Sequence, residues 1–283
     1  MDQGIEVQAI PSVAAGRARG GRATQEDAFV CLHDPASDVR LLVLADGMGG
    51  DGAGELASAG VVEVARRLWQ HGLWRDQPGP LFLESLCQAA HAELRKRGER
   101  LTDASPHSTV VALLIRGRRA CWAHVGDSRL YRFHGARCLD RTIDHSVAQL
   151  KVARGELAAE AVGRDADQHK LLRGLGGPQP PQVEHGLAVL RPGQSFVLCS
   201  DGAWESLSTA ELGRLARRRN QRRALHDGLQ RAVERGGADG DNVSLIFARV
   251  GWVQWWRARG AGSRAQPAGR HPVRPGDMGI RQA

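Results

Sequence analysis

Five short segments place a carboxylate at the start or end of an apolar stretch of the sequence. They are Arg22-Ala23-Thr24-Gln25-Glu26-Asp27, Asp46-Gly47-Met48-Gly49-Gly50, Gly126-Asp127-Ser128-Arg129, Ser200-Asp201-Gly202 and Gly240-Asp241-Asn242. Glycine beside a carboxylate lets backbone carbonyls approach a ligand closely. A single Asp-Gly pair is compatible with an ordinary turn, but five such segments together indicate a shared site.

Carboxylates gathered at one edge of a sheet repel one another, so such a cluster persists only when protons or cations neutralise it. Oxygen ligands, with no Cys or His at metal spacing, favour hard ions such as Mg²⁺ or Mn²⁺ over Zn²⁺. Two such ions lower the pKa of a shared water and clamp the oxygens of a phosphoryl group. The segments therefore predict metal-assisted hydrolysis of a phosphate ester.

The elements that must position these segments are strands and helices in a mixed order. Apolar runs predict strands over 28–32, 39–45, 195–199 and 242–250, and a hairpin of 110–115 with 120–125. Spacing near 3.6 residues predicts helices over 54–70, 80–100, 146–154 and 210–233. Consecutive strands joined by short turns, with grouped helices, favour largely antiparallel sheets covered by helices.

In this order and at these separations, the five segments resemble the motifs of metal-dependent protein phosphatases, the protein phosphatase 2C-like family of bacterial type. The resemblance implies an α+β fold, a four-layer α-β-β-α sandwich of two mainly antiparallel sheets flanked by helix pairs. It implies a catalytic domain over residues 1–250, and the residues after it, 251–283, are expected to be a basic, disordered tail. It implies hydrolysis of phosphoserine and phosphothreonine on proteins by a metal-bridging water or hydroxide, without a phosphoenzyme intermediate.

The resemblance also implies the ligands of two Mn²⁺ or Mg²⁺ ions. Asp46 would bridge both ions, and Asp201 and Asp241 would complete the shell of one. Glu26 and the carbonyl of Gly47 would hold the other. The segment 151–177 corresponds to the mobile flap that lies beside the active site in this family.

Further positions take supporting roles by the same resemblance. Asp127, with Asp201, matches a third metal position of bacterial-type members. Arg22 would grip the substrate phosphate, a task that suits a planar bidentate guanidinium, and Asp27 would lie behind the ligands. Many eukaryotic members carry His where this chain has Met48, which cannot transfer a proton. We therefore expect a metal-bound water as general acid, with His124 as the alternative.

Composition limits the other possibilities. The chain has 283 residues, a formal net charge of +8 and five widely spaced cysteines, which we expect to be reduced and buried. The positive charge is concentrated in arginine-rich stretches and in the tail without aromatic residues interleaved, so we expect no nucleic-acid binding. Neither a membrane-spanning run nor a signal peptide is evident, so we expect a cytoplasmic location. We also expect a monomer. The family resemblance implies phosphorylated proteins as partners, including a cognate kinase and its targets.

Four other interpretations were weighed. The pattern G-x-G-x-x-G over 47–52 suggests a dinucleotide site, but Asp46 would repel a pyrophosphate and no acidic second strand follows. Ser128 resembles a hydrolase nucleophile, yet Leu130 stands where a nucleophile elbow needs Gly. A phosphoprotein-binding module without turnover and a basic nucleic-acid binder also remain as functions of a different class.

The histidines, His124 and His145 included, have no partners at ligand spacing and are expected to be structural or exposed. Asp144-His145-Ser146 predicts a helix N-cap, with Asp144 or Ser146 accepting from free backbone amides.

Overall fold

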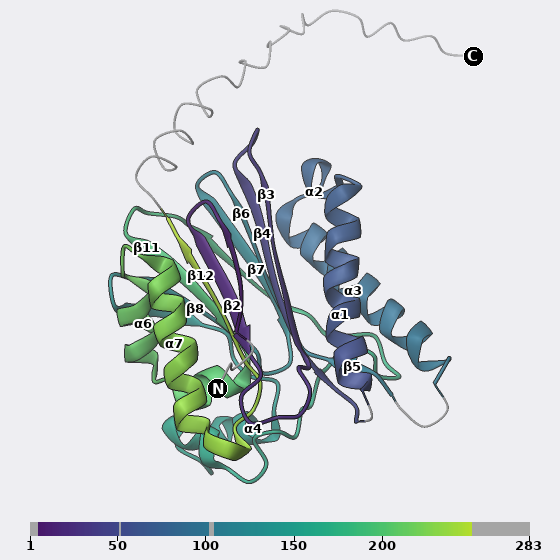
Figure 1. Ribbon diagram of the computed structural model, residues 1–283. Coiled ribbons are helices and arrows are strands. Elements are labelled where there is room, and N and C mark those ends of the chain that lie inside the picture. Colours follow the sequence, from purple (N-terminus) through teal and green to yellow (C-terminus); the bar gives the residue numbers. More distant parts are fainter. Residues whose placement is uncertain (1–4, 51, 102–104, 251–283) are drawn as a thin grey trace, which may run out of the picture.

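The computed structural model describes residues 5–50, 52–101 and 105–250, which form two six-stranded sheets packed face to face (Figure 1). One sheet has the order β1-β2-β12-β11-β8-β9, and the other has the order β10-β7-β6-β4-β3, with β5 paired to β4. The strand pairings within both sheets are antiparallel. The strands are β1 (Glu6–Ile10), β2 (Val13–Ala18), β3 (Asp27–Asp34), β4 (Val39–Met48), β5 (His107–Ser108), β6 (Val110–Arg116), β7 (Arg119–Val125), β8 (Arg129–His134), β9 (Arg137–Arg141), β10 (Glu184–Val189), β11 (Gln194–Cys199) and β12 (Val243–Arg249).

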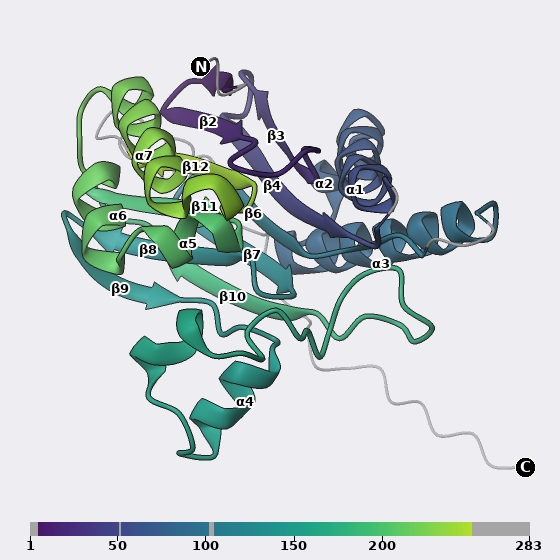
Figure 2. The ribbon, with the colours of Figure 1, turned by 60° about the horizontal axis from the view of Figure 1, so that its bottom comes forward.

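Helices cover the outer face of each sheet. They are α1 (Ala53–Gln70), α2 (Leu73–Asp76), α3 (Gly79–Gly98), α4 (Val147–Ala153), α5 (Asp201–Ser206), α6 (Thr209–Ala216) and α7 (Gln221–Gly236), with the short 3₁₀ helices η1 (Ala159–Arg164) and η2 (Gly237–Asp239). In Figure 1 and, after a turn about the horizontal axis, in Figure 2, α1 and α3 lie on one side of the paired sheets and α6 and α7 on the other. The predicted four-layer sandwich is therefore confirmed.

Three apolar cores match these layers. One core joins α1 and α3 to the β4 sheet, a second fills the space between the sheets, and a third joins α5, α6 and α7 to the β12 sheet. The alternation of side chains along a strand divides the strands between neighbouring cores. In β4, for example, Leu41 and Val43 face the helices, whereas Leu42 and Leu44 face the other sheet.

The acidic segments meet because of the antiparallel pairing. When neighbouring strands run in opposite directions, the end of one lies beside the start of the next. Asp27, at the start of β3, pairs with Asp46 near the end of β4. Likewise, Cys199 at the end of β11 pairs with Leu245 near the start of β12, which brings Asp201 close to Asp241.

Two predicted boundaries are wrong. The strand predicted to stop at residue 45 continues through Met48, because Gly47 and Met48 pair with Ser108 and His107 of β5. The helix predicted over 210–233 is broken into α6 and α7, because the side chain of Asn220 accepts from the Arg223 amide and starts a new helix. The predicted tail lies outside the described residues, and within them no helix is long and apolar enough to cross a membrane.

Candidate metal centre

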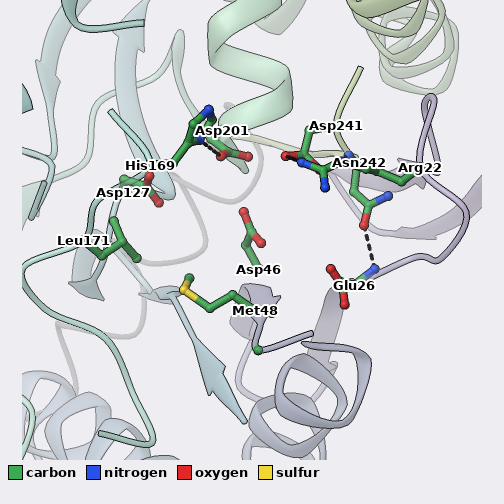
Figure 3. Close-up of a pocket in the computed structure, with 12 residues that line it drawn as sticks. Arg22, Glu26, Asp46, Met48, Asp127, His169, Leu171, Asp201, Asp241 and Asn242 are labelled. Carbon is green, nitrogen blue, oxygen red and sulfur yellow. Dashed lines mark hydrogen bonds and ion pairs between the residues drawn. The ribbon is translucent and has the colours of Figure 1, made fainter. Parts of the chain in front are cut away.

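A pocket of about 210 Å³ lies where the acidic segments converge (Figure 3). Its lining includes every predicted site residue except Asp27. The lining residues are Arg22, Glu26, Asp46, Gly47, Met48, Gly49, Asp127, His169, Leu171, Asp201, Asp241 and Asn242. In Figure 3, Asp46 lies near the centre, with Asp127 and Asp201 on one side and Glu26 on the other.

Backbone hydrogen bonds fix the central carboxylate. The amide of Asp46 donates to Thr109 Oγ1 (3.0 Å), and the Thr109 amide donates to the Asp46 carbonyl (2.8 Å). A Cβ on Gly47 would lie 1.9 Å from the carbonyl oxygen of Gly54 in α1, so only glycine allows the helix to start this close to the strand. The Gly47 amide donates to the Glu26 carbonyl (3.0 Å), which ties two predicted ligands together.

Asp127 follows β7 in a tight turn. Gly126 has a φ of 107°, which favours glycine, and the indole Nε1 of Trp204 donates to the Asp127 carbonyl (3.0 Å). Ser128 is buried and its hydroxyl hydrogen-bonds Thr109 Oγ1 (2.8 Å). These contacts support the interpretation of Ser128 as part of this turn.

Asp27 does not line the pocket and is only 1% exposed. One of its carboxylate oxygens accepts from the Ser200 hydroxyl (2.8 Å), while Oδ1 is buried without a hydrogen-bond partner. The Asp241 carboxylate accepts from the Arg22 guanidinium (2.7 Å) and from the backbone amide of Asn242 (2.7 Å). Arg22 therefore lies beside the acids, with half of its side chain exposed at the pocket.

Burial and mutual repulsion oppose ionisation of these acids. Burial is the largest of the causes that raise the pKa of Asp46 well above its usual value. The negative charges of neighbouring acids raise it further, in the order Asp201, Asp27, Asp127 and Asp241. Burial and then Asp201 raise the pKa of Asp127 and of Asp241. Burial also raises the pKa of Asp27, to about 7.

Such a cluster fits hard divalent cations. Positive charge in the pocket would compensate the desolvated carboxylates, and oxygen donors are what Mg²⁺ and Mn²⁺ prefer. Glu26, Asp46, Asp127, Asp201 and Asp241 present five carboxylates, and Gly47 adds a backbone carbonyl.

Sequence reasoning overlooked two polar residues at the pocket, His169 and Asn242. His169 Nδ1 lies 3.5 Å from Asp201 Oδ2, and the ligand atoms of His169, Asp201 and Glu205 all lie within 4.8 Å of one another. The hydrogen bond to Asp201 raises the pKa of His169 to about 9. No linear motif surrounds His169, whereas Asn242 directly follows a predicted ligand and could have been found.

The histidines have no partners at ligand spacing in the sequence, but two of them lie together in the fold. The rings of His124 and His145 stack with centroids 4.6 Å apart, and their ligand atoms lie within 4.8 Å of each other and of Glu184. The strand pairing creates this group, because Glu184 of β10 lies opposite His124 of β7.

A metal is nevertheless disfavoured at this histidine pair. The Gly126 amide donates to His145 Nδ1 (3.1 Å), so the proton of the neutral ring is on Nε2, which faces Glu184 Oε1 at 3.2 Å. A metal would need the Nε2 lone pair that this proton occupies. The predicted helix cap nearby is confirmed for Ser146, whose side chain accepts from the Gln149 amide, whereas Asp144 pairs with Arg129.

A protein-family model described as Protein phosphatase 2C matches residues 17–235. The chain belongs to the protein phosphatase 2C family. The predicted family and the enzyme class, protein-serine/threonine phosphatase, are confirmed with it.

Curated relatives of this 2C-type phosphatase come from several bacteria. The serine/threonine protein phosphatase PstP of Mycobacterium tuberculosis is 29% identical over 235 residues, which is 81% of this chain and 43% of PstP. The serine/threonine phosphatase stp of Listeria innocua is 26% identical over 219 residues, which is 76% of this chain and 86% of the relative.

Solved structures of the same class superpose closely on this 2C-type phosphatase. A crystal structure of the M. tuberculosis PstP/Ppp phosphatase is 27% identical with a TM-score of 0.73, covering 84% of this chain and 98% of that one. The PstP catalytic domain in complex with two manganese ions is 28% identical with a TM-score of 0.70. The match covers 84% of this chain and 97% of that one.

Without divalent ions, the stability of this phosphatase should fall as pH rises from about 4 to 9. The folded pKa values of Asp27 and Glu205, both about 7, and of His169, about 9, are raised. A raised folded pKa lowers stability between the unfolded and the folded pKa, so the two acids act from about pH 4 to 7 and His169 from about pH 6.5 to 9. Asp27 alone should remove about 1.4 kcal/mol per pH unit between about pH 4 and 7.

Thermal melts in EDTA across this pH range measure the effect. Saturating Mn²⁺ should flatten the decline, because cations replace protons as the neutralising charge. The variant Asp27→Asn should show a shallower decline in EDTA than the unmodified chain. Equal slopes in both proteins would contradict the assigned role of Asp27.

Asn242→Ala should lower the free energy of unfolding by about 2–3 kcal/mol. Asn242 Oδ1 accepts from the Glu26 amide (2.6 Å), and Nδ2 donates to the carbonyls of Arg19 (2.8 Å) and Thr24 (3.0 Å). The loop that carries Arg22 and Glu26 would lose three hydrogen bonds. Urea denaturation checks the stability, and phosphatase activity should fall as well.

Asn220→Ala is the matched control, because its side chain caps α7 and does not line the pocket. It should lose about 1 kcal/mol of stability and retain activity. Full activity in Asn242→Ala would show that the loop keeps its position without this side chain.

Proposed function

We propose that this chain is a serine/threonine protein phosphatase that holds two Mn²⁺ or Mg²⁺ ions with Glu26, Asp46, the Gly47 carbonyl, Asp201 and Asp241. The observation that carries the proposal is the convergence of these groups, from four separate segments, on the pocket that Arg22 also lines. Asp127 would contribute, with Asp201, to the binding of a third ion. Two ions held there would lower the pKa of water and place positive charge on the phosphoryl oxygens.

The chain's own residues would orient the substrate. Arg22 pairs with Asp241 (2.7 Å) and has half of its side chain exposed, so its guanidinium can also donate to phosphate oxygens. The pocket lining contains no Ser, Thr or Cys among the described residues, so no hydroxyl or thiol nucleophile lines it. The attack we propose is direct, by water, without a phosphoenzyme. His124 is not suited to protonate a leaving group, because it is 3% exposed, lies outside the lining, and its Nε2 contacts the Ile143 carbonyl at 2.9 Å.

The substrates we propose are phosphoserine and phosphothreonine proteins, including a partner kinase and its targets. The names of the bacterial relatives, which are serine/threonine phosphatases, support this substrate class. The dinucleotide interpretation fails, because the strands around residues 47–52 belong to an antiparallel sheet rather than to a parallel βαβ unit.

Hydrolysis of p-nitrophenyl phosphate and of a phosphothreonine peptide with Mn²⁺ tests the proposal. Both activities should disappear in EDTA and return when Mn²⁺ is added. Binding of the phosphopeptide without turnover under any divalent ion would instead favour a phosphoprotein-binding module. Salt-sensitive retardation of nucleic acid in a gel, without phosphatase activity, would favour a basic nucleic-acid binder.

A further inference from the structure

A second groove, of about 540 Å³, lies beside the metal pocket. Met48, His169 and Leu171 line both spaces, so the two are neighbours. Figure 3 shows Leu171 and Met48 on the side of Asp46 that faces away from Arg22 and Glu26. The lining of this flap groove is Met48, His107, His169, Leu171, Leu172, Arg173, Gly174, Gly177, Pro178, Gln179, Pro180, Pro181 and Gln182.

The lining of the flap groove combines apolar side chains with Arg, His and Gln, and it contains no carboxylate. Met48, Leu171, Leu172 and three prolines provide its apolar side chains, and the lining includes neither Asp nor Glu. Leu172 is 54% exposed, so its side chain is available for contact. By contrast, a third pocket that shares Arg22, His169 and Asp241 with the metal site is also lined by Glu205 and Asp239. The two flanks of the metal site therefore differ in chemistry.

The wall of the flap groove is anchored to the fold. The Leu172 amide donates to the His145 carbonyl (2.8 Å), and Leu175 exchanges backbone hydrogen bonds with Ser108 (2.8 and 3.2 Å). The Gly176 amide donates to His91 Nδ1 (3.2 Å), and Arg173 pairs with Glu184 (3.3 Å). Because prolines and these contacts already fix the wall, a ligand would order few additional groups on binding.

We propose that the flap groove binds an apolar side chain of the substrate, close in sequence to the phosphorylated residue. The inference rests on the phosphatase function proposed above. An extended peptide advances about 3.3 Å per residue, so when its phosphate lies at the metals, a side chain a few residues away reaches Met48 and Leu171. The preferred substrates are therefore phosphoproteins with Leu, Ile, Met or Phe on one flank of the phosphoresidue. A Lys at that position would meet no opposite charge in the lining.

A leucine scan of phosphothreonine peptides tests this inference. One Leu is moved through the four positions on each side of phosphothreonine in an alanine host, and kcat/KM is measured with Mn²⁺. At one or two positions on one flank, Leu should raise kcat/KM about tenfold over Ala, and Lys there should give no gain. Leu172→Ser should remove most of this preference while hydrolysis of p-nitrophenyl phosphate, which has no peptide flank, stays unchanged.

Leu187→Ser is the matched control. Leu187 lies in β10, is 68% exposed and does not line the flap groove, so this variant should keep the peptide preference. A flat leucine scan in an active enzyme, or a preference that survives in Leu172→Ser, would overturn the inference but leave the phosphatase function intact. Failure to hydrolyse even p-nitrophenyl phosphate with any divalent ion would overturn both.

Discussion

Replacing Asp46 by Asn should lower Mn²⁺-dependent hydrolysis of p-nitrophenyl phosphate by about a thousandfold or more, equivalent to about 4 kcal/mol of transition-state stabilisation. Asparagine keeps nearly the same shape and one carbonyl oxygen, but it carries no charge and cannot bridge two cations. Asp46 lies at the centre of the pocket, and its backbone is fixed by Thr109, so no neighbouring carboxylate can take its place. Asp201→Asn should cause a comparably severe loss.

Metal binding provides a second measurement for these variants. Mn²⁺ should raise the melting temperature of the unmodified chain and have a much smaller effect on Asp46→Asn. In EDTA, Asp46→Asn should be at least as stable as the unmodified chain, because it removes one charge from a repelling cluster. Asp140→Asn, an exposed change in β9, is the control and should keep activity. Activity within tenfold of normal in Asp46→Asn would exclude a bridging role.

The sequence was sufficient to predict the acids of the site because each belongs to a short local motif. Asp46, Asp127 and Asp201 follow apolar strands, and the antiparallel pairing brings these strand ends to one edge of the fold. His169 has no such motif. Its position at the pocket depends on how the segment after η1 folds. Tertiary contacts hold that segment, such as the hydrogen bond from the Val147 amide to the Lys170 carbonyl (2.9 Å).

The fold was predicted best where apolar runs are long. The β6–β7 hairpin and helices α1 and α3 were placed to within a few residues. The strands β1, β2, β5, β8, β9 and β10 are not predicted. The edge strands β1, β9 and β10 carry polar or exposed residues, β5 has two residues, and Gly or Arg interrupts the apolar side chains of β2 and β8. The flap groove could not be predicted either, since Met48 and Leu172 are far apart in the sequence and meet only through the fold.

Asp144→Ala should lower the free energy of unfolding by about 3–5 kcal/mol, because it leaves a buried arginine without its counter-charge. Arg129 Nε donates to Asp144 Oδ1 (2.8 Å), and the two side chains are 9% and 1% exposed. The guanidinium also donates to the Tyr131 hydroxyl (3.1 Å) and lies 3.5 Å from the centre of the Trp204 ring. Urea denaturation measures the loss.

The double variant Arg129→Met/Asp144→Leu separates the charge from the packing. It should recover most of the lost stability, because it removes both charges and leaves apolar side chains of similar size. A loss below 1 kcal/mol in Asp144→Ala would show that water reaches Arg129. Trp204 stacks on Arg129 and donates to the Asp127 carbonyl (3.0 Å), so breaking the pair should also weaken metal binding at Asp127. Mn²⁺ titration followed by calorimetry would detect this change even where the folded fraction of Asp144→Ala remains high. Such a result would link the interior of the β12 sheet to the metal pocket.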